Sequence, residues 1–127
     1  MLDTFGRYQP YAIALLRIFA GLLYLAHGTQ KLFGFPIAGP ESLSSLMLAS
    51  GLLEVVLGVL IVIGLFTRPA ALLASGHMAA AYFMAHAPQS FYPVANGGDA
   101  AILFCFVFLA LVTTGPGAFA ADNARKP

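Results

Sequence analysis

The residues that could do chemistry are a few polar side chains set within long apolar stretches. In RIFAGLLYLAHGTQKLFGF, residues 17–35, helical spacing places Arg17, Tyr24 and Lys31 in one stripe, together with His27 or Gly28. The other faces of this helix carry leucine, isoleucine, alanine and phenylalanine. A charge is costly in contact with acyl chains, so the stripe is expected to face protein or water.

Glu54 lies near the middle of GLLEVVLGVLIVIGLF, with apolar residues on both sides. An isolated carboxylate there would take up a proton or pair with a cation. In straight helices Glu54 lies about 18 Å and Arg17 about 9 Å from the same interface, and an extended arginine side chain covers much of that difference. An Arg17 to Glu54 pair is therefore one expectation, and the alternative is that Arg17 binds a ligand. The pair would serve either to fix the helix register or as part of a proton or ligand site.

The histidines extend this polar pattern. His27 is near the outer end of the first apolar span, His77 near mid-depth in the third, and His86 at the outer end of the third. Helical spacing puts His77 and His86 on opposite faces, so one pocket would hold both only if the helix deformed near Pro88. The face of His77 also carries Ala80, Ala81 and Met84, whereas Tyr82 shares the face of His86. Histidine carries protons near neutral pH. His77 is therefore expected either to carry a proton or to form a hydrogen bond between helices.

The segment FYPVANGGDAAILF forms the last loop and the start of the last apolar span. Asn96-Gly97-Gly98 is typical of a turn, and Asp99 stands where a helix N-cap is wanted. This alone would explain the sequence as a tight re-entry into a helix. In a four-span arrangement, however, the loop lies on the same side as His27, Lys31 and His86. That grouping predicts a polar mouth above Arg17, Glu54 and His77.

Four apolar stretches must position these residues, and we expect transmembrane helices at about 11–33, 46–66, 69–86 and 99–114. Their ends are marked by glycine and proline in Gly34-Phe35-Pro36, Thr67-Arg68-Pro69 and Gly115-Pro116-Gly117. The connections are too short for a separate soluble domain. The expected fold is therefore all-α, an integral membrane bundle of four transmembrane helices that forms one domain over residues 1–127.

Composition supports this class. Of the 127 residues, 60% are hydrophobic and 9% are charged, far fewer charges than a soluble domain carries. A net charge of +1 provides no basic surface for nucleic acid. Cys105 is the only cysteine, which excludes an internal disulfide and a thiolate metal cage. No histidine or carboxylate spacing indicates a metal site, so redox chemistry would need a borrowed cofactor.

Basic residues predict the orientation. Arg7, Arg68, Arg125 and Lys126 lie on one side of the four-span arrangement and Lys31 on the other, so both termini are expected in the cytoplasm. The first apolar run is longer than a signal-peptide core and has no clear small-residue cleavage site, which favours a retained helix. The expected location is the bacterial cytoplasmic (inner) membrane, with several crossings.

The chain resembles the DoxX family of small four-helix bacterial membrane proteins. The resemblance covers nearly the whole length and rests on Arg17 followed by HGTQKLFGF, on GLLEVVLGVLIVIGLFTRPAALL, on NGGDAAILF, and on TTGPGAF with Asp122. The family commonly has glutamate after Asn-Gly-Gly, where this chain has Asp99. The resemblance implies a link to quinone reduction, thiosulfate oxidation, oxidative stress and membrane oxidoreductase assemblies. It also implies that a shared site is lined by Arg17, His27, Lys31, Glu54, Asn96 and Asp99.

The leading hypothesis is a component of a quinone-linked redox or oxidative-stress system that binds a quinone-like molecule in a polar pocket. Glu54 or His77 would exchange protons, and Arg17 and Lys31 would stabilise oxyanion charge. The expected ligand-binding residues are Arg17, Tyr24, His27, Lys31, Glu54, His86, Asn96 and Asp99. No independent catalytic motif is present, so two alternatives remain: a non-catalytic membrane anchor or assembly subunit for a redox enzyme, and a small permease or proton-coupled carrier. The expected partners are membrane lipid, a redox enzyme and further copies of the chain, and not nucleic acid.

Overall fold

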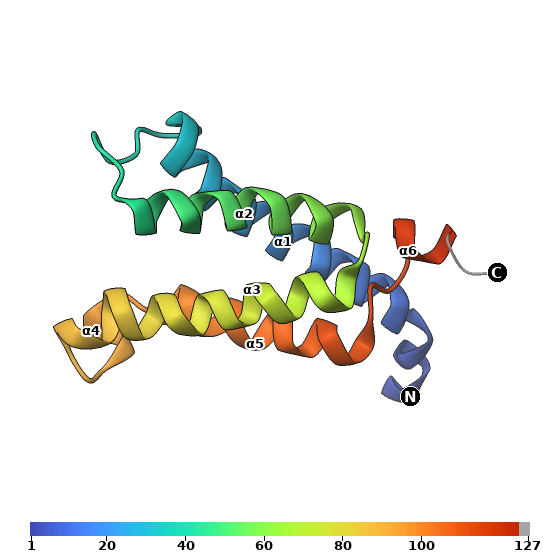
Figure 1. Ribbon diagram of the computed structural model, residues 1–127. Coiled ribbons are helices and arrows are strands. Elements are labelled where there is room, and N and C mark those ends of the chain that lie inside the picture. The colour runs from blue at the N-terminus through green and yellow to red at the C-terminus, as the bar shows by residue number, and fades with distance from the viewer. Residues whose placement is uncertain (125–127) are drawn as a thin grey trace.

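The computed structural model describes residues 1–124, and every regular element in that range is helical. This confirms the expected all-α class. The four longer helices are α1 (Gln9–Phe33), α2 (Ser45–Ile63), α3 (Thr67–Ala81) and α5 (Asp99–Thr114), shown in Figure 1. The short elements are η1 (Leu2–Tyr8), η2 (Tyr82–His86), η3 (Ala87–Gln89), α4 (Pro93–Asn96) and α6 (Ala121–Ala124). Arg125 and Lys126, which entered the orientation argument, lie outside the described residues.

Local chemistry explains where the helices begin and end. Gly34 and Gly64 end α1 and α2 with φ angles of +67° and +72°, a left-handed conformation that glycine adopts without strain. Ser44 caps α2, because its hydroxyl accepts the backbone N–H of Met47 at 3.2 Å. The second helix therefore ends at Ile63, three residues before the predicted end at Phe66. The third helix begins at Thr67, two residues before the predicted start at Pro69.

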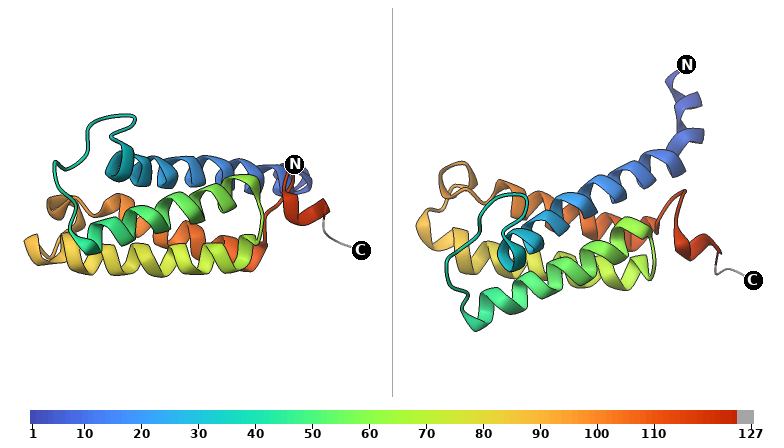
Figure 2. Two further views of the ribbon diagram at one scale, coloured as in Figure 1. Left: turned by 45° about the horizontal axis from the view of Figure 1, so that its top comes forward. Right: turned by 90° about the horizontal axis from the view of Figure 1, so that it is seen from above.

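The four longer helices form two antiparallel pairs that lie side by side. Helix α1 packs along α2, and α3 packs along α5, as Figures 1 and 2 show. Both described ends of the chain lie at one end of the bundle, with α6. Helix α4 and the loop between α1 and α2 lie at the other end.

Glycines permit the close approach of α1 and α2. A Cβ atom on Gly28 would lie 2.8 Å from the Cβ atom of Glu54, and one on Gly58 would lie 2.9 Å from that of Leu25. Small residues serve this purpose in membrane bundles, where close backbone packing supplies the attraction between helices. Gly28 therefore lets α2 bring its carboxylate directly against α1.

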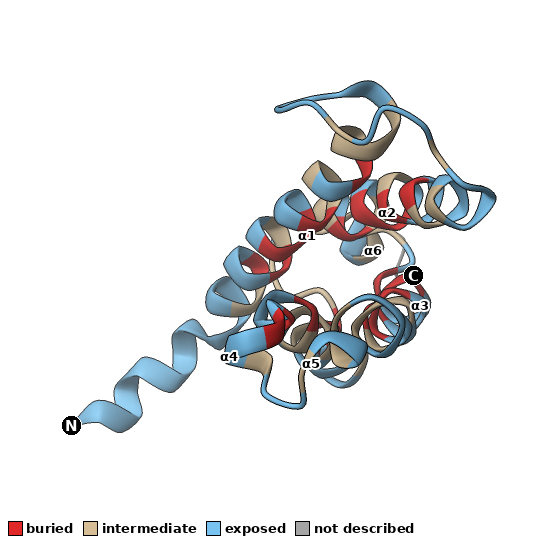
Figure 3. Ribbon diagram, turned by 90° about the vertical axis from the view of Figure 1, so that its left-hand side faces the viewer, coloured by how far each residue is buried: buried red, intermediate tan, exposed pale blue. Residues whose placement is uncertain are grey.

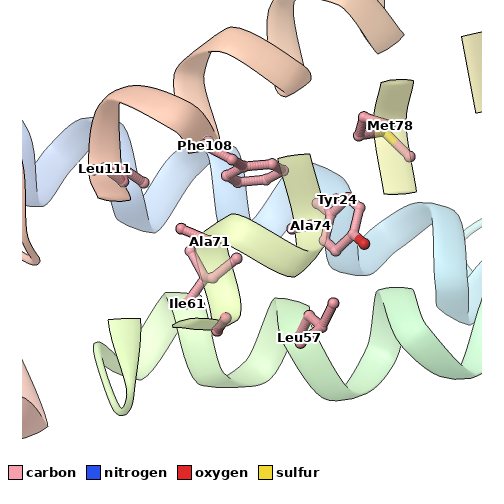
Figure 4. Packing of buried hydrophobic residues seen from close by; sticks show 10 residues of the cluster. Tyr24, Leu57, Ile61, Ala71, Ala74, Met78, Phe108 and Leu111 are labelled. Carbon is pink, nitrogen blue, oxygen red and sulfur yellow. The ribbon is translucent and has the colours of Figure 1, made fainter. Parts of the chain in front are cut away.

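The apolar core fills the space between the two helix pairs. Its largest members include Tyr24, Ile61, Phe108 and Leu111, which Figure 4 shows at close range. Figure 3, an end-on view, shows buried residues on the inward faces and exposed residues around the outside. Many of the outward residues are large and apolar, among them Leu15, Phe19, Leu23, Leu52, Val56, Leu72, Leu73, Leu103 and Phe106.

Two helical stretches within the described residues are long and apolar enough to cross a membrane, 2–33 and 45–63. Only 33% and 28% of their most apolar windows are buried inside the protein. The core helix of a soluble protein would be mostly covered, whereas these helices turn their apolar surface outward. Helix α5 is similarly apolar but shorter.

Candidate functional site

The centre of the site is an ion pair between α1 and α2. Lys31 Nζ lies 2.6 Å from Glu54 Oε1 and also donates to Ser50 Oγ at 3.2 Å. The Glu54 side chain is only 3% exposed and that of Lys31 24% exposed. The lysine therefore points inward and compensates a carboxylate that the apolar surroundings would otherwise disfavour.

The expected Arg17 to Glu54 pair is wrong. Glu54 faces Gly28, which is one helical turn from Lys31. Arg17 is about 16 Å from Gly28 along the axis of α1, at 1.5 Å per residue, toward the N-terminus of the helix. The estimate from straight helices placed the two side chains at similar depth because it could not include the register set by the glycine contacts. Lys31 is the cation that this register brings to the carboxylate.

His77 extends the pair into a longer hydrogen-bonded chain. Ser50 Oγ lies 2.8 Å from His77 Nε2, and His77 Nδ1 lies 2.8 Å from the Tyr24 hydroxyl. We call Glu54, Lys31, Ser50, His77 and Tyr24 the polar chain. It begins in α2, uses side chains of α1 and α3, and so ties three helices together.

The polar chain ends inside the apolar core. Tyr24 is fully buried, and its ring contacts Phe108 edge-on with centroids 5.1 Å apart. Phe104, which stacks on Phe108, also lies against the tyrosine ring, with centroids 6.1 Å apart. These contacts fix the tyrosine, which in turn fixes one nitrogen of His77.

A pocket of about 380 Å³ opens between α2 and α3 beside the polar chain. Lys31, Ser50 and His77 form its polar part. The remaining lining is apolar and consists of Leu46, Met47, Ala49, Leu53, Ala80, Ala81, Met84 and Ala85. The predicted shared face of His77, Ala80, Ala81 and Met84 is therefore confirmed, and it is the α3 wall of this pocket.

A second groove, of about 320 Å³, lies between α1 and α5. Its lining is entirely apolar: Leu16, Phe19, Ala20, Leu23, Ala100, Leu103, Phe104 and Val107. A hollow therefore lies on each side of the core, where one helix pair meets the other. Of these two hollows, only the α2/α3 pocket is lined by charged or polar side chains.

Arg17 lies away from the pocket and is fully buried at the other end of the bundle. Its guanidinium donates to the backbone oxygens of Pro116 at 3.1 Å, Ala118 at 3.4 Å and Phe119 at 2.9 Å. A planar group with several donors suits such a set of carbonyls. Arg17 therefore holds the segment after α5 against α1.

Asp122 completes this fastening. Its carboxylate accepts the backbone N–H groups of Phe66 at 2.7 Å and Thr67 at 2.9 Å, at the start of α3. Its own N–H donates to the Gly64 oxygen at 2.8 Å. We call residues 115–124 the C-terminal segment. It joins the ends of α1, α2 and α3.

The other expected site residues do not converge on the polar chain. His27 is exposed and contacts Phe104 edge-on at 6.1 Å. His86 donates to the Asn96 backbone oxygen at 3.1 Å, and the Asn96 amide donates to the Tyr82 hydroxyl at 3.1 Å. The deformed end of α3, which continues as η2, thus has its own hydrogen-bonded cluster, separate from the contacts of Lys31.

Asp99 does not cap α5 as predicted. The N-cap is Gly98, and Asp99 is the exposed first residue of the helix. The turn is instead fixed by Asn96, whose side-chain oxygen accepts the Gly98 N–H at 2.8 Å. Asp99 still lies in the first turn, where negative charge is favourable. The common polar mouth expected above Glu54 is not formed by these residues.

Sequence reasoning missed Ser50. It lies one helical turn before Glu54, so both occupy one face of α2. A serine at that spacing from a buried carboxylate was the feature of the sequence that could have indicated its place in the site. Its role depends on His77 and Lys31, which come from two other helices.

These features define a helical membrane protein with a charged pair held inside the bundle. The DoxX family model matches residues 12–87, so the chain belongs to the DoxX family. An uncharacterized protein of Haemophilus influenzae is 40% identical over 129 residues, covering 96% of each chain. No solved structure matches.

Replacing Lys31 by methionine leaves the Glu54 carboxylate buried without its cation. Lys31→Met is expected to lower the free energy of unfolding by about 3 kcal/mol. Combined with Glu54→Gln, the loss is expected to be smaller than the sum of the two single losses, because no lone charge remains. Titration of the purified protein with a denaturing detergent measures all four corners of this cycle. Strictly additive losses would contradict a direct pair.

Replacing Arg17 by alanine removes the donors that hold the C-terminal segment. Hydrogen bonds to a charged group contribute about 1.5–3 kcal/mol each, so amide exchange in this segment should accelerate at least about tenfold. The amides to follow are those of Ala118 and Asp122, which donate to Pro10 and Gly64. Arg7→Ala, in exposed η1, is the control. Unchanged exchange in Arg17→Ala would refute the fastening role.

Proposed function

We propose that this DoxX-family protein is a membrane-embedded component of a quinone-linked redox or oxidative-stress system. In this proposal the α2/α3 pocket binds a quinone-like headgroup. The observation that carries it is the composition of the pocket, which combines Lys31, Ser50 and His77 with an otherwise apolar wall. Family membership and the quinone link implied by the resemblance favour the same ligand class.

The pocket suits the chemistry of such a molecule. A volume of about 380 Å³ falls within the range of small-molecule sites, about 300–1,000 Å³. The oxygen atoms of a headgroup can meet the polar part of the pocket, while alanine, leucine and methionine face a ring and an apolar tail. Because the outer faces of α2 and α3 are apolar, a lipid-soluble ligand would enter from the bilayer.

The polar chain assigns a role to each residue. Lys31 carries the positive charge that stabilises developing negative charge on a ligand oxygen, and His77 exchanges a proton with that oxygen through the Ser50 hydroxyl. Glu54 does not line the pocket, so it acts as a positioning residue that holds the Lys31 side chain in place. Arg17 has a structural role and does not touch the ligand. A bound quinone supplies a carrier for two electrons and two protons, the electrons coming from a partner oxidoreductase or a soluble reductant.

We further propose that all four longer helices cross the bacterial cytoplasmic membrane, with both termini in the cytoplasm. Helices α1 and α2 have the required length and hydropathy. Helix α3 is prolonged by η2 and η3 as far as Gln89, whereas α5 is short and would be accommodated by local thinning of the bilayer. Arg7 belongs to η1 and Arg68 to the first turn of α3. Both elements begin at the end of the bundle that holds the termini, and basic residues there agree with the positive-inside rule.

Cysteine labelling of intact cells tests this orientation. In a Cys105→Ser background, Ser42→Cys in the loop between α1 and α2 should react with a membrane-impermeant maleimide. Thr4→Cys should react only after the membrane is permeabilised. Both positions are exposed, so accessibility within the protein does not limit the reaction. The opposite pattern would reverse the orientation, and equal labelling of both in intact cells would contradict an odd number of crossings between them.

A pair of pocket-filling variants tests the quinone site. Protein purified in mild detergent is extracted with organic solvent and analysed for quinone by mass spectrometry. We expect near-stoichiometric quinone in the wild type and its loss in Ala80→Phe, which fills the α2/α3 pocket. Ala100→Phe, at an exposed alanine of the α1/α5 groove, should retain it. A folded wild type that carries no quinone and binds none when it is added would defeat the proposal and favour a non-catalytic anchor.

A further inference from the structure

We infer that the α2/α3 pocket selects the oxidised form of its ligand, because the polar side chains that line it present hydrogen-bond donors and no free acceptor. This inference rests on the proposed function, since it concerns the same pocket. It follows from assigning each hydrogen along the polar chain, starting from its buried end at Tyr24.

The Tyr24 hydroxyl fixes the position of the His77 proton. Tyr24 is fully buried, and His77 Nδ1 is its only hydrogen-bond partner within residues 1–124. If Nδ1 carried the proton, the tyrosine hydrogen would be buried without an acceptor, which costs about 1–3 kcal/mol. The tyrosine therefore donates to Nδ1. The neutral imidazole then carries its proton on Nε2.

Ser50 becomes a donor toward the pocket as a result. Its oxygen lies 2.8 Å from His77 Nε2 and 3.2 Å from Lys31 Nζ, and both of these groups donate to it. Both lone pairs of the hydroxyl are then used. The serine O–H makes no hydrogen bond to another described residue, and Ser50 lines the pocket. Its hydrogen is therefore available to a ligand.

Lys31 adds a second available donor. An ammonium group has three N–H bonds, and Glu54 and Ser50 accept two of them. The third is available in the pocket, where Lys31 is part of the lining. Glu54, the nearest acceptor, is not part of the lining, and the other lining side chains are apolar. The polar part of the pocket thus offers donors from Lys31 and Ser50.

This pattern fits a carbonyl oxygen, which accepts two hydrogen bonds and donates none. A quinone carbonyl can accept from both Lys31 and Ser50. A quinol hydroxyl in the same place would bring one more hydrogen into a site without an acceptor. That penalty corresponds to about tenfold weaker binding or more. The pocket would accordingly retain the oxidised molecule and release the reduced one.

The tautomer of His77 can be observed without any ligand. In protein labelled with ¹⁵N-histidine, the His77 signals are those absent from His77→Gln. We expect a proton on Nε2 and an unprotonated Nδ1 at neutral pH. Tyr24→Phe should change this pattern because it removes the fixed donor. A proton on Nδ1 in the wild type, or an imidazolium, would overturn the inference even if quinone binds.

Binding of a matched redox pair tests the selectivity. Dissociation constants for duroquinone and durohydroquinone, the latter kept reduced, are measured by calorimetry in detergent. We expect duroquinone to bind at least about tenfold more tightly. Ser50→Ala should reduce this preference, whereas Ser75→Ala should leave it unchanged, because Ser75 bonds to Cys105 at the α3/α5 contact. Equal affinities, or tighter quinol binding, would overturn the inference alone. Failure of both probes to bind would overturn the proposed function with it.

Discussion

The buried carboxylate of Glu54 is the constraint on which the rest of the bundle depends. An ionised group surrounded by apolar helices is tolerated only when a cation and further hydrogen bonds compensate it. Lys31 supplies the charge, but it can do so only because Gly28 brings α1 and α2 together at that level. Ser50 accepts a second hydrogen bond from the lysine, and His77 connects the serine to α3. One costly group thereby sets the register of α1 against α2 and the position of both against the second helix pair.

The two ends of the bundle are held in different ways. At the end with the termini, Arg17 and Asp122 fasten the C-terminal segment, and Arg68 donates to the last carbonyls of α5, at 2.8 Å to Val112 and 2.9 Å to Thr113. Those partners are backbone groups, so the charged side chains at this end hold segments of the chain together. In the other half, side chains bond to side chains and a pocket remains beside them. The pocket and the fastening of the C-terminal segment therefore use different charged residues, although Arg17, Lys31 and Glu54 all lie within apolar stretches of the sequence.

The sequence was informative wherever a local pattern determines the structure. Glycine and proline marked the helix ends, and helical spacing correctly separated His77 from His86 and joined His77 to Ala80 and Met84. It failed where the answer depends on the register between helices. Arg17 and Lys31 were both suitable cations for Glu54, and only the contact at Gly28 decides between them. Ser50 was missed for the same reason, since a serine becomes part of a site only through partners on other helices.

The polar chain also explains why a single pocket can have both a permanent charge and a neutral overall balance. Lys31 and Glu54 compensate each other at short range, so no uncompensated charge disfavours a neutral ligand in the pocket. One of the three lysine hydrogens has no acceptor among the described residues, and Lys31 lines the pocket. His77 is held by Tyr24 on the side of the core, which leaves Nε2 to the serine. In the proposed site, Tyr24 acts on a bound ligand through two intervening side chains, His77 and Ser50. A residue that packs as part of the apolar core therefore determines which hydrogens the pocket presents.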